Sequence, residues 1–273
     1  MRITSYNILD GGIGRADPLA EVILAQRPDI VALVEADDAE VVERIAARAK
    51  MDFIHAKGGK KGAALLSRWP IRETIDHTAV MLSTPSPGTP GEGRGGGSSA
   101  SGRLPKSLLE ATVLEPTAHE WTIGVVHLTA HADEKSERKR EHEIEIVLEA
   151  FAHHRSANHP HLLMGDFNSN SPIQLIDPEK TKPETRQEWR ENGGQIPRRV
   201  VQQLLDAGYV DSLYAFDPQR ARTLGSFSTQ FPGQRVDYIF TFGTAKIRQA
   251  WIEQDRLAKY ASDHFPIGAE LDL

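Results

Sequence analysis

The 273-residue sequence contains no cysteine, which excludes disulfide bonds, zinc–thiolate sites and thiol nucleophiles. Aromatic residues make up only 7% of the chain and are not interleaved with basic residues, so we expect no stacking platform for single-stranded nucleic acid. Nowhere do 18 apolar residues run together, so we expect no membrane span. The N-terminus lacks an apolar signal core, and we therefore expect a cytoplasmic protein.

The charge of the chain is weakly acidic rather than basic. There are 32 Lys and Arg residues against 38 Asp and Glu, a formal net charge of −6. This balance argues against a protein that coats nucleic acid through general basic charge, although it leaves a local basic cleft open. Hydrophobic residues make up 39% of the chain, an ordinary composition for a globular protein.

Short apolar runs alternate with amphipathic segments, which predicts α/β layers. Strands are predicted at residues 3–9, 30–34, 161–164, 223–228 and 236–242, among others. The spacing at residues 133–154 predicts one long helix whose many charges face solvent. Residues 177–194 are polar, and no regular structure is predicted there.

Residues 83–107 are dominated by Gly, Pro, Ser and Thr. Such a composition buries too little apolar surface to offset the entropy lost on ordering. Neither flank supplies enough helix to cover its own strands. We therefore expect a flexible surface loop within a single domain spanning residues 1–273, rather than a linker between two domains.

Polar side chains stand at the ends of six predicted strands. The ends of strands in a rigid sheet are favourable places for catalytic groups, because the scaffold fixes their geometry. Each position alone also fits a turn, a helix cap or a buried hydrogen bond, but six in one chain favour a common site. The residues are Asn7, Glu35, His127, Asp166 with Asn168, Asp237, and Asp263 with His264.

This set combines carboxylates, amides and imidazoles. Its several hard oxygen ligands suit Mg²⁺ or Mn²⁺ better than zinc. A divalent ion together with a histidine and an aspartate suits hydrolysis of a phosphate ester. The ion neutralises charge on the phosphate, a carboxylate aligns water, and amide or imidazolium donors hold the non-bridging oxygens.

In their order along the chain, these blocks resemble the endonuclease/exonuclease/phosphatase superfamily of deoxyribonuclease-I-like, metal-dependent phosphoesterases. Residues 62–71, a glycine-led apolar strand closed by a Ser-Arg-Trp-Pro-Ile turn, are similar to a further block of that family. The resemblance runs from Asn7 to His264. It is carried by Ser5-Tyr6-Asn7, Val34-Glu35, Val126-His127-Leu128, Gly165-Asp166-Phe167-Asn168-Ser169, Arg235-Val236-Asp237-Tyr238-Ile239 and Ser262-Asp263-His264-Phe265-Pro266.

The resemblance implies an α/β (α+β) fold, a four-layer sandwich of two mixed β-sheets flanked by helices, with the active site at one edge. It implies that Glu35 is the principal Mg²⁺ ligand, with Mn²⁺ as the alternative ion, and that Asn7 and Asp263 lie beside the metal. Asp166 would align or activate the attacking water, and Asn168 would help to fix phosphate and water.

The resemblance also assigns the imidazoles and a basic residue. His264 would contact the phosphate and pair with Asp237, and His127 would add a second imidazole. Family members often place an Arg or Tyr on the strand before the His127 strand. The candidates here are Arg103 and Lys106, and solvated loop charge is the alternative interpretation for both.

The implied activity is Mg²⁺-dependent hydrolysis of a phosphodiester or phosphomonoester by in-line attack of water. The substrate could be a nucleic acid, a phospholipid or a small molecule, and we expect a monomer. A DNA-repair-type endonuclease or exonuclease is one alternative. A phosphate-binding scaffold without catalysis is another, but binding alone needs no metal ligand together with a water-positioning carboxylate.

A histidine-rich patch lies near the end of the predicted long helix, at His153, His154, His159 and His161. A metal site is one interpretation of such a patch. The histidines follow no single helical face and no carboxylate joins them in the sequence, so a solvated helix end is the favoured interpretation.

Overall fold

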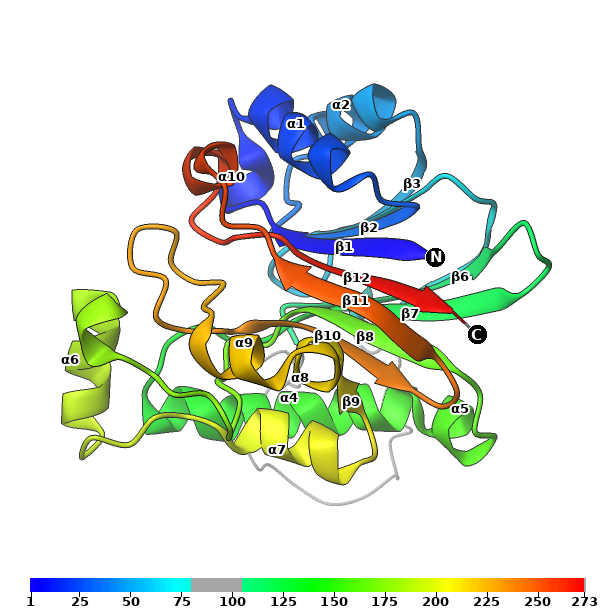
Figure 1. Ribbon diagram of the computed structural model, residues 1–273. Helices are drawn as coiled ribbons and strands as arrows, with labels where there is room; N and C mark the ends of the chain where they lie inside the picture. Colours follow the sequence, from blue (N-terminus) through cyan, green and yellow to red (C-terminus); the bar gives the residue numbers. More distant parts are fainter. Residues whose placement is uncertain (80–104, 273) are drawn as a thin grey trace, which may run out of the picture.

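The computed structural model describes residues 1–79 and 105–272 of the chain. Two six-stranded β-sheets lie face to face, and helices cover their outer surfaces (Figure 1). Each sheet contains both parallel and antiparallel strand pairs. The predicted four-layer sandwich of two mixed sheets is therefore confirmed.

The first sheet has the strand order β11-β12-β1-β2-β4-β3, in which β1 and β2 are parallel. Its middle strand β2 is buried along its whole length, as its continuous apolar run predicts for a strand covered on both faces. The strands of this sheet are β1 (Arg2–Asn7), β2 (Ile30–Val34), β3 (Asp52–Ala56), β4 (Ala63–Ser67), β11 (Lys246–Ile252) and β12 (Ile267–Asp272).

The second sheet has the strand order β5-β6-β7-β8-β10-β9, in which β7 and β8 are parallel. Its strands are β5 (Ile71–Asp76), β6 (Ser107–Leu114), β7 (Glu120–His127), β8 (His161–Asp166), β9 (Val210–Asp211) and β10 (Asp237–Phe242).

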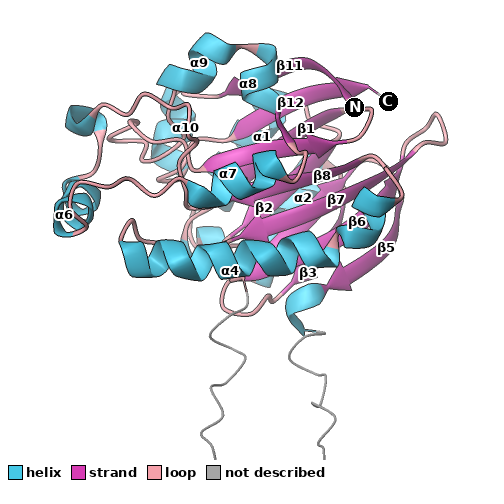
Figure 2. Cartoon of the chain, turned by 90° about the horizontal axis from the view of Figure 1, so that it is seen from below, coloured by secondary structure: helices cyan, strands magenta, loops and turns pink. Residues whose placement is uncertain are grey.

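Helices lie over the outer faces of both sheets (Figures 1 and 2). The first sheet carries α1 (Ala16–Gln26) and α2 (Ala39–Ala49), and the second carries α4 (Glu134–Ala150) and α7 (Arg199–Asp206). The other helical segments are η1 (Asp10–Gly12), α5 (Ala152–Ser156), η3 (Pro178–Lys180), α6 (Pro183–Glu191), α8 (Ser212–Phe216), α9 (Pro218–Thr223) and α10 (Arg256–Ala261). Within residues 1–79 and 105–272, none of the helices combines the length and the apolarity needed to cross a bilayer.

Amphipathic patterning explains how the helices are held. The Asp38 carboxylate accepts hydrogen bonds from two backbone N–H groups at the start of α2, which satisfies donors that the helix itself leaves free. Val42, Ile45 and Ala49 then fall on its buried face. On the other side of the molecule, Val147 of α4 packs in a second apolar cluster with residues of the second sheet and α7.

The strand directions bring the predicted site residues to one edge of the sandwich. The chain leaves β1, β2, β7 and β8 at this edge, and the antiparallel partners of these strands begin there. The strand pairing places Asp237 opposite Asp166, Ser107 opposite His127, and Ala63 opposite Val34. At this edge, residues at the end of one strand therefore lie beside residues at the start of its antiparallel partner.

Several predictions of secondary structure were wrong. The helix predicted at residues 133–154 is two helices, because the chain leaves helical geometry at the fully buried Phe151. The charges on its inner face are not solvated, since Glu137, Arg140 and Glu143 are fully buried. The segment 177–194, expected to be irregular, contains η3 and α6.

One further prediction was wrong, and another concerns residues that the structure mostly does not describe. Residues 223–228 do not form the predicted strand. Thr223 is the last residue of α9, whose first turn is capped by Asp217, and Phe227 makes only isolated bridges. The loop predicted at residues 83–107 falls mostly outside the described residues, as does Arg103, and Ser107 already belongs to β6.

Candidate active site

The Asn7 side chain, at the end of β1, stands between the two sheets and links the predicted site residues. Its Nδ2 atom donates to Asp166 Oδ2 at 3.1 Å and to Glu35 Oε1 at 3.3 Å, and lies 3.4 Å from His264 Nε2. Its Oδ1 atom accepts from the backbone N–H of Leu9 at 3.0 Å. One buried amide at the end of β1 therefore connects side chains that lie beside the ends of three other strands.

Asp166, His264 and Asp237 form a buried charged row. His264 Nδ1 donates to Asp237 Oδ2 at 2.9 Å, and His264 Nε2 lies 3.8 Å from Asp166 Oδ2. Burial alone would lower the pKa of His264, but the carboxylates of Asp237 and Asp166 raise it to about 10. Burial and the negative charge of Asp237 raise the pKa of Asp166 to about 7. The ring is therefore an imidazolium at neutral pH.

Glu35 follows β2 in a left-handed backbone conformation, with φ of 55°. Its Oε2 atom accepts from the backbone N–H of Asp10 at 3.1 Å and lies 3.2 Å from Lys61 Nζ. Burial favours the neutral acid, yet the Asp10 N–H and the Lys61 ammonium outweigh it and lower the pKa of Glu35. Glu35 thus presents a carboxylate, with Oε1 facing Asn7.

Lys61 is a residue of this edge that the sequence interpretation missed. Its Nζ atom lies 2.9 Å from carboxylate oxygens of both Asp10 and Asp37. Partial burial opposes the charge, but these hydrogen bonds raise the pKa of Lys61 above its ordinary value. Its position directly before the apolar strand at residues 62–71 was the available signal, because β4 runs antiparallel to β2 and so begins beside Glu35.

His127, at the end of β7, is fully buried. Its Nε2 atom lies 3.6 Å from Asp166 Oδ2 and 4.0 Å from Glu35 Oε1. Lys106 Nζ lies 2.9 Å from the same nitrogen and donates to it. Burial, with the positive charges of Lys106 and His264, lowers the pKa of His127 well below its ordinary value. His127 is therefore neutral, and Lys106 lies at the site.

Asp263 and Asn168 complete the predicted set. Asp263 Oδ1 lies 4.0 Å from His264 Nε2, is buried, and has no hydrogen-bond partner in the described part of the chain. Asn168 is held in a left-handed turn after β8, where its backbone N–H donates to Asp166 Oδ1 at 2.9 Å and its Nδ2 donates to the Leu128 carbonyl at 3.2 Å. Of the predicted site residues, only Arg103 lies outside the described residues.

The buried charges of α4 hold the segments that carry these side chains. Arg140 Nη1 donates to the carbonyls of Thr129 and His131, directly after β7. Glu143 accepts from the Thr129 N–H at 2.8 Å and from its hydroxyl at 2.6 Å. Glu137 accepts from the Ser169 hydroxyl at 3.3 Å, one residue after Asn168. Helical periodicity offered no sign of this role, because polar residues on a helix normally face water.

A pocket opens beside the site, towards α6. The centres of the Phe227 and His264 rings are 4.6 Å apart, and Lys182 Nζ lies 4.6 Å from the centre of the Phe227 ring. The residues that line the pocket include Asn168, Phe227, Lys182, Glu184, Glu188 and His131. The segment at residues 177–194 therefore forms one wall of a cavity next to the predicted catalytic residues.

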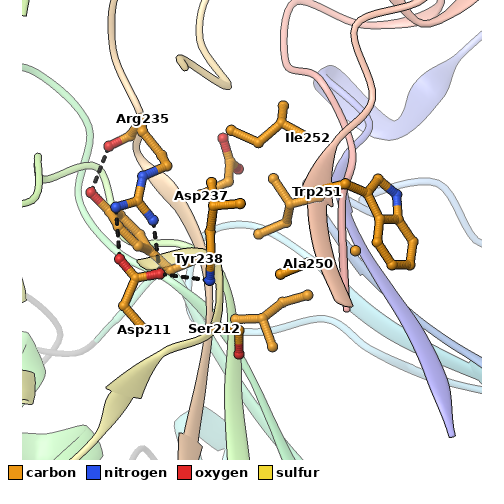
Figure 3. Close-up of a pocket in the computed structure, with 12 residues that line it drawn as sticks. Asp211, Ser212, Arg235, Asp237, Tyr238, Ala250, Trp251 and Ile252 are labelled. Carbon is orange, nitrogen blue, oxygen red and sulfur yellow. Dashed lines mark hydrogen bonds and ion pairs between the residues drawn. The ribbon is translucent and has the colours of Figure 1, made fainter. Parts of the chain in front are cut away.

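A buried ion pair anchors the start of β10 on the far side of Asp237 (Figure 3). Arg235 makes two hydrogen bonds to the Asp211 carboxylate, at 2.9 and 2.6 Å. Both side chains are almost completely buried. This bidentate pair fixes the backbone two residues before Asp237. The small pocket drawn in Figure 3 lies against this pair, and its lining includes neither Asn7 nor Glu35.

Known structures share this fold at low sequence identity. The 3′ phosphatase NExo from Neisseria, bound to a product DNA hairpin, is 21% identical, with a TM-score of 0.68 and full coverage of both chains. An AP endonuclease from Archaeoglobus fulgidus is 17% identical, with a TM-score of 0.66 and full coverage of both chains. A mannosyl-6-phosphatase from Bacteroides thetaiotaomicron is 19% identical, with a TM-score of 0.63 and full coverage of both chains. At these identities the likeness establishes the fold.

The family is established by the sequence itself. No curated protein matches the chain, but residues 4–264 match the model of one family. The matched range contains every predicted site residue, from Asn7 to His264. The resemblance noted in the sequence is thereby confirmed. The chain belongs to the Endonuclease/Exonuclease/phosphatase family, whose enzymes hydrolyse phosphate ester bonds.

Proposed function

We propose that this protein is a Mg²⁺-dependent phosphoesterase that hydrolyses a phosphodiester or phosphomonoester by in-line attack of water. The observation that carries the proposal is the position of the Asn7 amide nitrogen. It lies within 3.4 Å of Glu35, Asp166 and His264. A metal-ligand carboxylate, a water-aligning carboxylate and a charged imidazole thus share one small volume, as the reaction requires.

The residues present fit a divalent cation at Glu35. Glu35 Oε1 is a carboxylate oxygen facing the site, and the buried Asp263 Oδ1 has no partner among the residues that the structure describes. Hard oxygen donors of this kind suit Mg²⁺, with Mn²⁺ as the alternative. When bound, the ion would neutralise charge on the phosphate and its leaving oxygen. Asn7 Nδ2 donates to Glu35 Oε1, and Asn7 would orient that carboxylate towards the ion.

A second set of residues lies close enough to hold a cation but is less suitable. Ligand atoms of Asp166, Asp237 and His264 all lie within 4.8 Å of one another. Asp237 Oδ2 already accepts from His264 and from the Ser226 hydroxyl, at 2.9 and 2.6 Å. A protonated imidazole has no lone pair for a metal. We therefore assign these three residues to proton and charge handling.

Each side chain of the candidate active site has a separate role in the proposed reaction. Asp166 accepts a hydrogen bond from the attacking water and aligns it, and its raised pKa suits a group that takes a proton near neutral pH. His264 donates from Nε2 to a non-bridging phosphate oxygen, while Asp237 fixes the ring. Neutral His127, at the end of β7, and Lys106, directly before β6, face the same oxygens. Asn168 holds phosphate and water from the next turn.

The substrate beyond the phosphate would occupy the pocket next to Phe227 and Lys182. Two neighbours in structure, by name a 3′ phosphatase bound to DNA and an AP endonuclease, support a DNA-repair nuclease as the second candidate. A third, by name a mannosyl-6-phosphatase, supports a small phosphomonoester. Glu184 and Glu188 on the pocket wall disfavour further phosphates there, because like charges repel.

A substrate panel tests the proposal. Phosphomonoesters, phosphodiesters, abasic DNA and phospholipids are each incubated with the protein in Mg²⁺ and in EDTA. We expect hydrolysis of at least one class in Mg²⁺, loss of that hydrolysis in EDTA, and its loss in His264→Ala. The exposed His142→Ala variant serves as the matched control. Binding of phosphate esters without turnover of any class would instead support the non-catalytic scaffold.

A further inference from the structure

Away from the candidate active site, a glutamate and several histidines meet on the outer face of the second sheet, against α5. Glu110 of β6 lies with Oε2 2.7 Å from His77 Nε2 and with Oε1 2.9 Å from His154 Nε2. The Glu110 residue is only 6% exposed. The cluster is separate from the site at the strand ends, because Glu110 lies three residues along β6 from Ser107, about 10 Å.

His153, the residue before His154 in α5, belongs to the same cluster. Ligand atoms of Glu110, His153 and His154 all lie within 4.8 Å of one another. The His153 and His154 rings are 3.7 Å apart between centroids. Consecutive helical residues project about 100° apart, so helical geometry alone does not turn both rings towards one carboxylate.

Local sequence patterns do not place a carboxylate here. The histidines at residues 153–161 were expected to be a solvated helix end because no acid lies among them. Glu110 comes from a strand that precedes them by more than 40 residues in the chain. The pairing of β5 with β6, which sets Ile75 opposite Glu110, also brings His77 to the same place.

We propose that Glu110, His153 and His154 form a transition-metal site that takes a cation of the Zn²⁺ class. Two imidazoles and one carboxylate are a ligand set typical of zinc, whereas Mg²⁺ prefers oxygen ligands alone. Zinc–ligand bonds of about 2.0–2.1 Å place tetrahedral ligand atoms about 3.3 Å apart. The separations here, from 2.9 Å for one pair to no more than 4.8 Å, bracket that value.

The neighbours of the cluster support this assignment. His77 is a positioning residue, since it contacts Oε2 and holds the Glu110 carboxylate with Oε1 towards His154. An ion between Glu110 Oε1 and His154 Nε2 would replace the hydrogen bond that now joins these two atoms. His161 is excluded as a ligand, because its two nitrogens contact the His159 carbonyl and the Tyr209 hydroxyl. An open groove reaches His153 and His154, and its wall includes Glu73 and Glu120. Water from this groove would complete the coordination.

An ion at this site would tie α5 to β6. His153 and His154 belong to a five-residue helix, whereas Glu110 belongs to β6, which is paired with strands on both sides. Because an ion that binds only the folded chain stabilises it by mass action, Zn²⁺ should raise the melting temperature. The effect concerns stability and does not depend on hydrolysis at the candidate active site.

Calorimetric titration with Zn²⁺ tests the site. The full chain is treated with EDTA, dialysed and held in saturating Mg²⁺ at pH 7.5, so that Mg²⁺ competes at Glu35. We expect wild type to bind Zn²⁺, and His153→Ala, His154→Ala and Glu110→Gln each to weaken that binding at least about tenfold. His142→Ala, an exposed histidine of α4, should bind Zn²⁺ as wild type does. Zn²⁺ should raise the melting temperature of wild type but not of Glu110→Gln.

Three results would overturn the proposal. Wild type could show no Zn²⁺ binding in Mg²⁺, or the ligand variants could bind Zn²⁺ as tightly as wild type. Zn²⁺ binding could also vanish in Glu35→Gln while persisting in His154→Ala, which would assign it to the candidate active site. If Glu110→Gln fails to fold, the result for His153→Ala decides whether the proposal stands. The His153 side chain is exposed, so its loss leaves no cavity in the core.

Discussion

Asp237 Oδ2 lies 2.9 Å from His264 Nδ1, which leaves the opposite ring nitrogen, Nε2, facing the site. The Ser226 hydroxyl donates to the same carboxylate oxygen at 2.6 Å, so the carboxylate is itself held in place. Asp237 therefore does two things at once. It fixes the ring orientation, and it keeps the imidazole charged despite burial.

The Asp237→Asn substitution tests this pair. The new amide would keep the shape of the side chain but lose the charge that supports the imidazolium, so we expect kcat to fall at least about 100-fold. Steady-state hydrolysis of the preferred substrate measures the change, and near-UV circular dichroism checks the fold. Asp272→Asn, at an exposed carboxylate paired with Arg248, should keep kcat. A kcat within twofold of wild type for Asp237→Asn would refute the role.

Glu35 is the residue whose change should act on the metal. In Glu35→Gln the anionic oxygen facing Asn7 is lost while the side-chain volume is kept, so the Mg²⁺ concentration that gives half-maximal activity should rise at least about tenfold. A Mg²⁺ titration of activity, with EDTA as the zero point, measures it. Glu21→Gln removes an exposed carboxylate on α1 and should leave the curve in place. If the Mg²⁺ titration curves of wild type and Glu35→Gln superimpose, Glu35 is not a ligand of the metal.

The strand ends could be predicted because their signal is local. Asn7, Glu35, His127 and Asp166 each follow an apolar run, and parallel strands deliver such residues to one edge of a sheet. The partners from antiparallel strands, such as Asp237, then follow from the same pairing. The fold class, and the meeting of most candidate site residues at one edge, were therefore accessible from the sequence.

What could not be predicted depends on tertiary contacts. Glu137 and Arg140 look like surface charges in the sequence, yet they are fully buried because they bind the backbone beside the site. Glu110 carries no periodic signal either, and the register of β5 against β6 brings it to His77. Lys61 had a local signal in its position directly before an apolar strand. That signal becomes specific only when the pairing of β4 with β2 is known, because this pairing sets Lys61 beside Glu35.

Gly165 tests the close pairing of β7 and β8. Its φ is 143°, and an added Cβ would lie 2.0 Å from the Val126 carbonyl oxygen, next to His127 and Asp166. Gly14 also has a positive φ, of 74°, but an added Cβ there meets no atom within 4 Å. We expect Gly14→Ala to cost about 1 kcal/mol, and Gly165→Ala at least about 2 kcal/mol more.

Urea unfolding of both glycine variants, followed by circular dichroism, gives these free energies. Gly14→Ala carries the strain of a positive φ without a clash. The larger loss in Gly165→Ala therefore reports the contact with Val126 together with the greater strain at a φ of 143°. Equal losses in the two variants would show that β7 and β8 can separate without cost at this point.

His161 should make stability depend on pH. Burial lowers its pKa to about 4 from an ordinary value of 6.5, against the hydrogen bond to the His159 carbonyl. Above pH 6.5 the ring is neutral in both states. As the pH falls below 6.5, the unfolded chain takes up a proton that the folded chain does not, so the free energy of unfolding falls towards pH 4. At about 1.4 kcal/mol per pKa unit, the loss approaches about 3 kcal/mol.

Equilibrium urea unfolding between pH 4 and 7, in EDTA, checks this dependence. His161→Gln cannot titrate, and its difference from wild type isolates this one group from the carboxylates that titrate nearby. The variant should be less stable than wild type at pH 7, where it loses native hydrogen bonds, and should show a shallower slope. Parallel curves for the two proteins would contradict the assignment.

The proposed reaction makes two central claims. Asp166 aligns the attacking water, and the new oxygen in the phosphate product comes from that water. We would run hydrolysis of the preferred substrate in ¹⁸O-labelled water with wild type and Asp166→Asn, in Mg²⁺ and in EDTA. The account predicts label in the released phosphate for wild type in Mg²⁺, no turnover in EDTA, and a rate for Asp166→Asn lower by about 1000-fold or more. Label in the alcohol product, or near-normal turnover by Asp166→Asn, would contradict it.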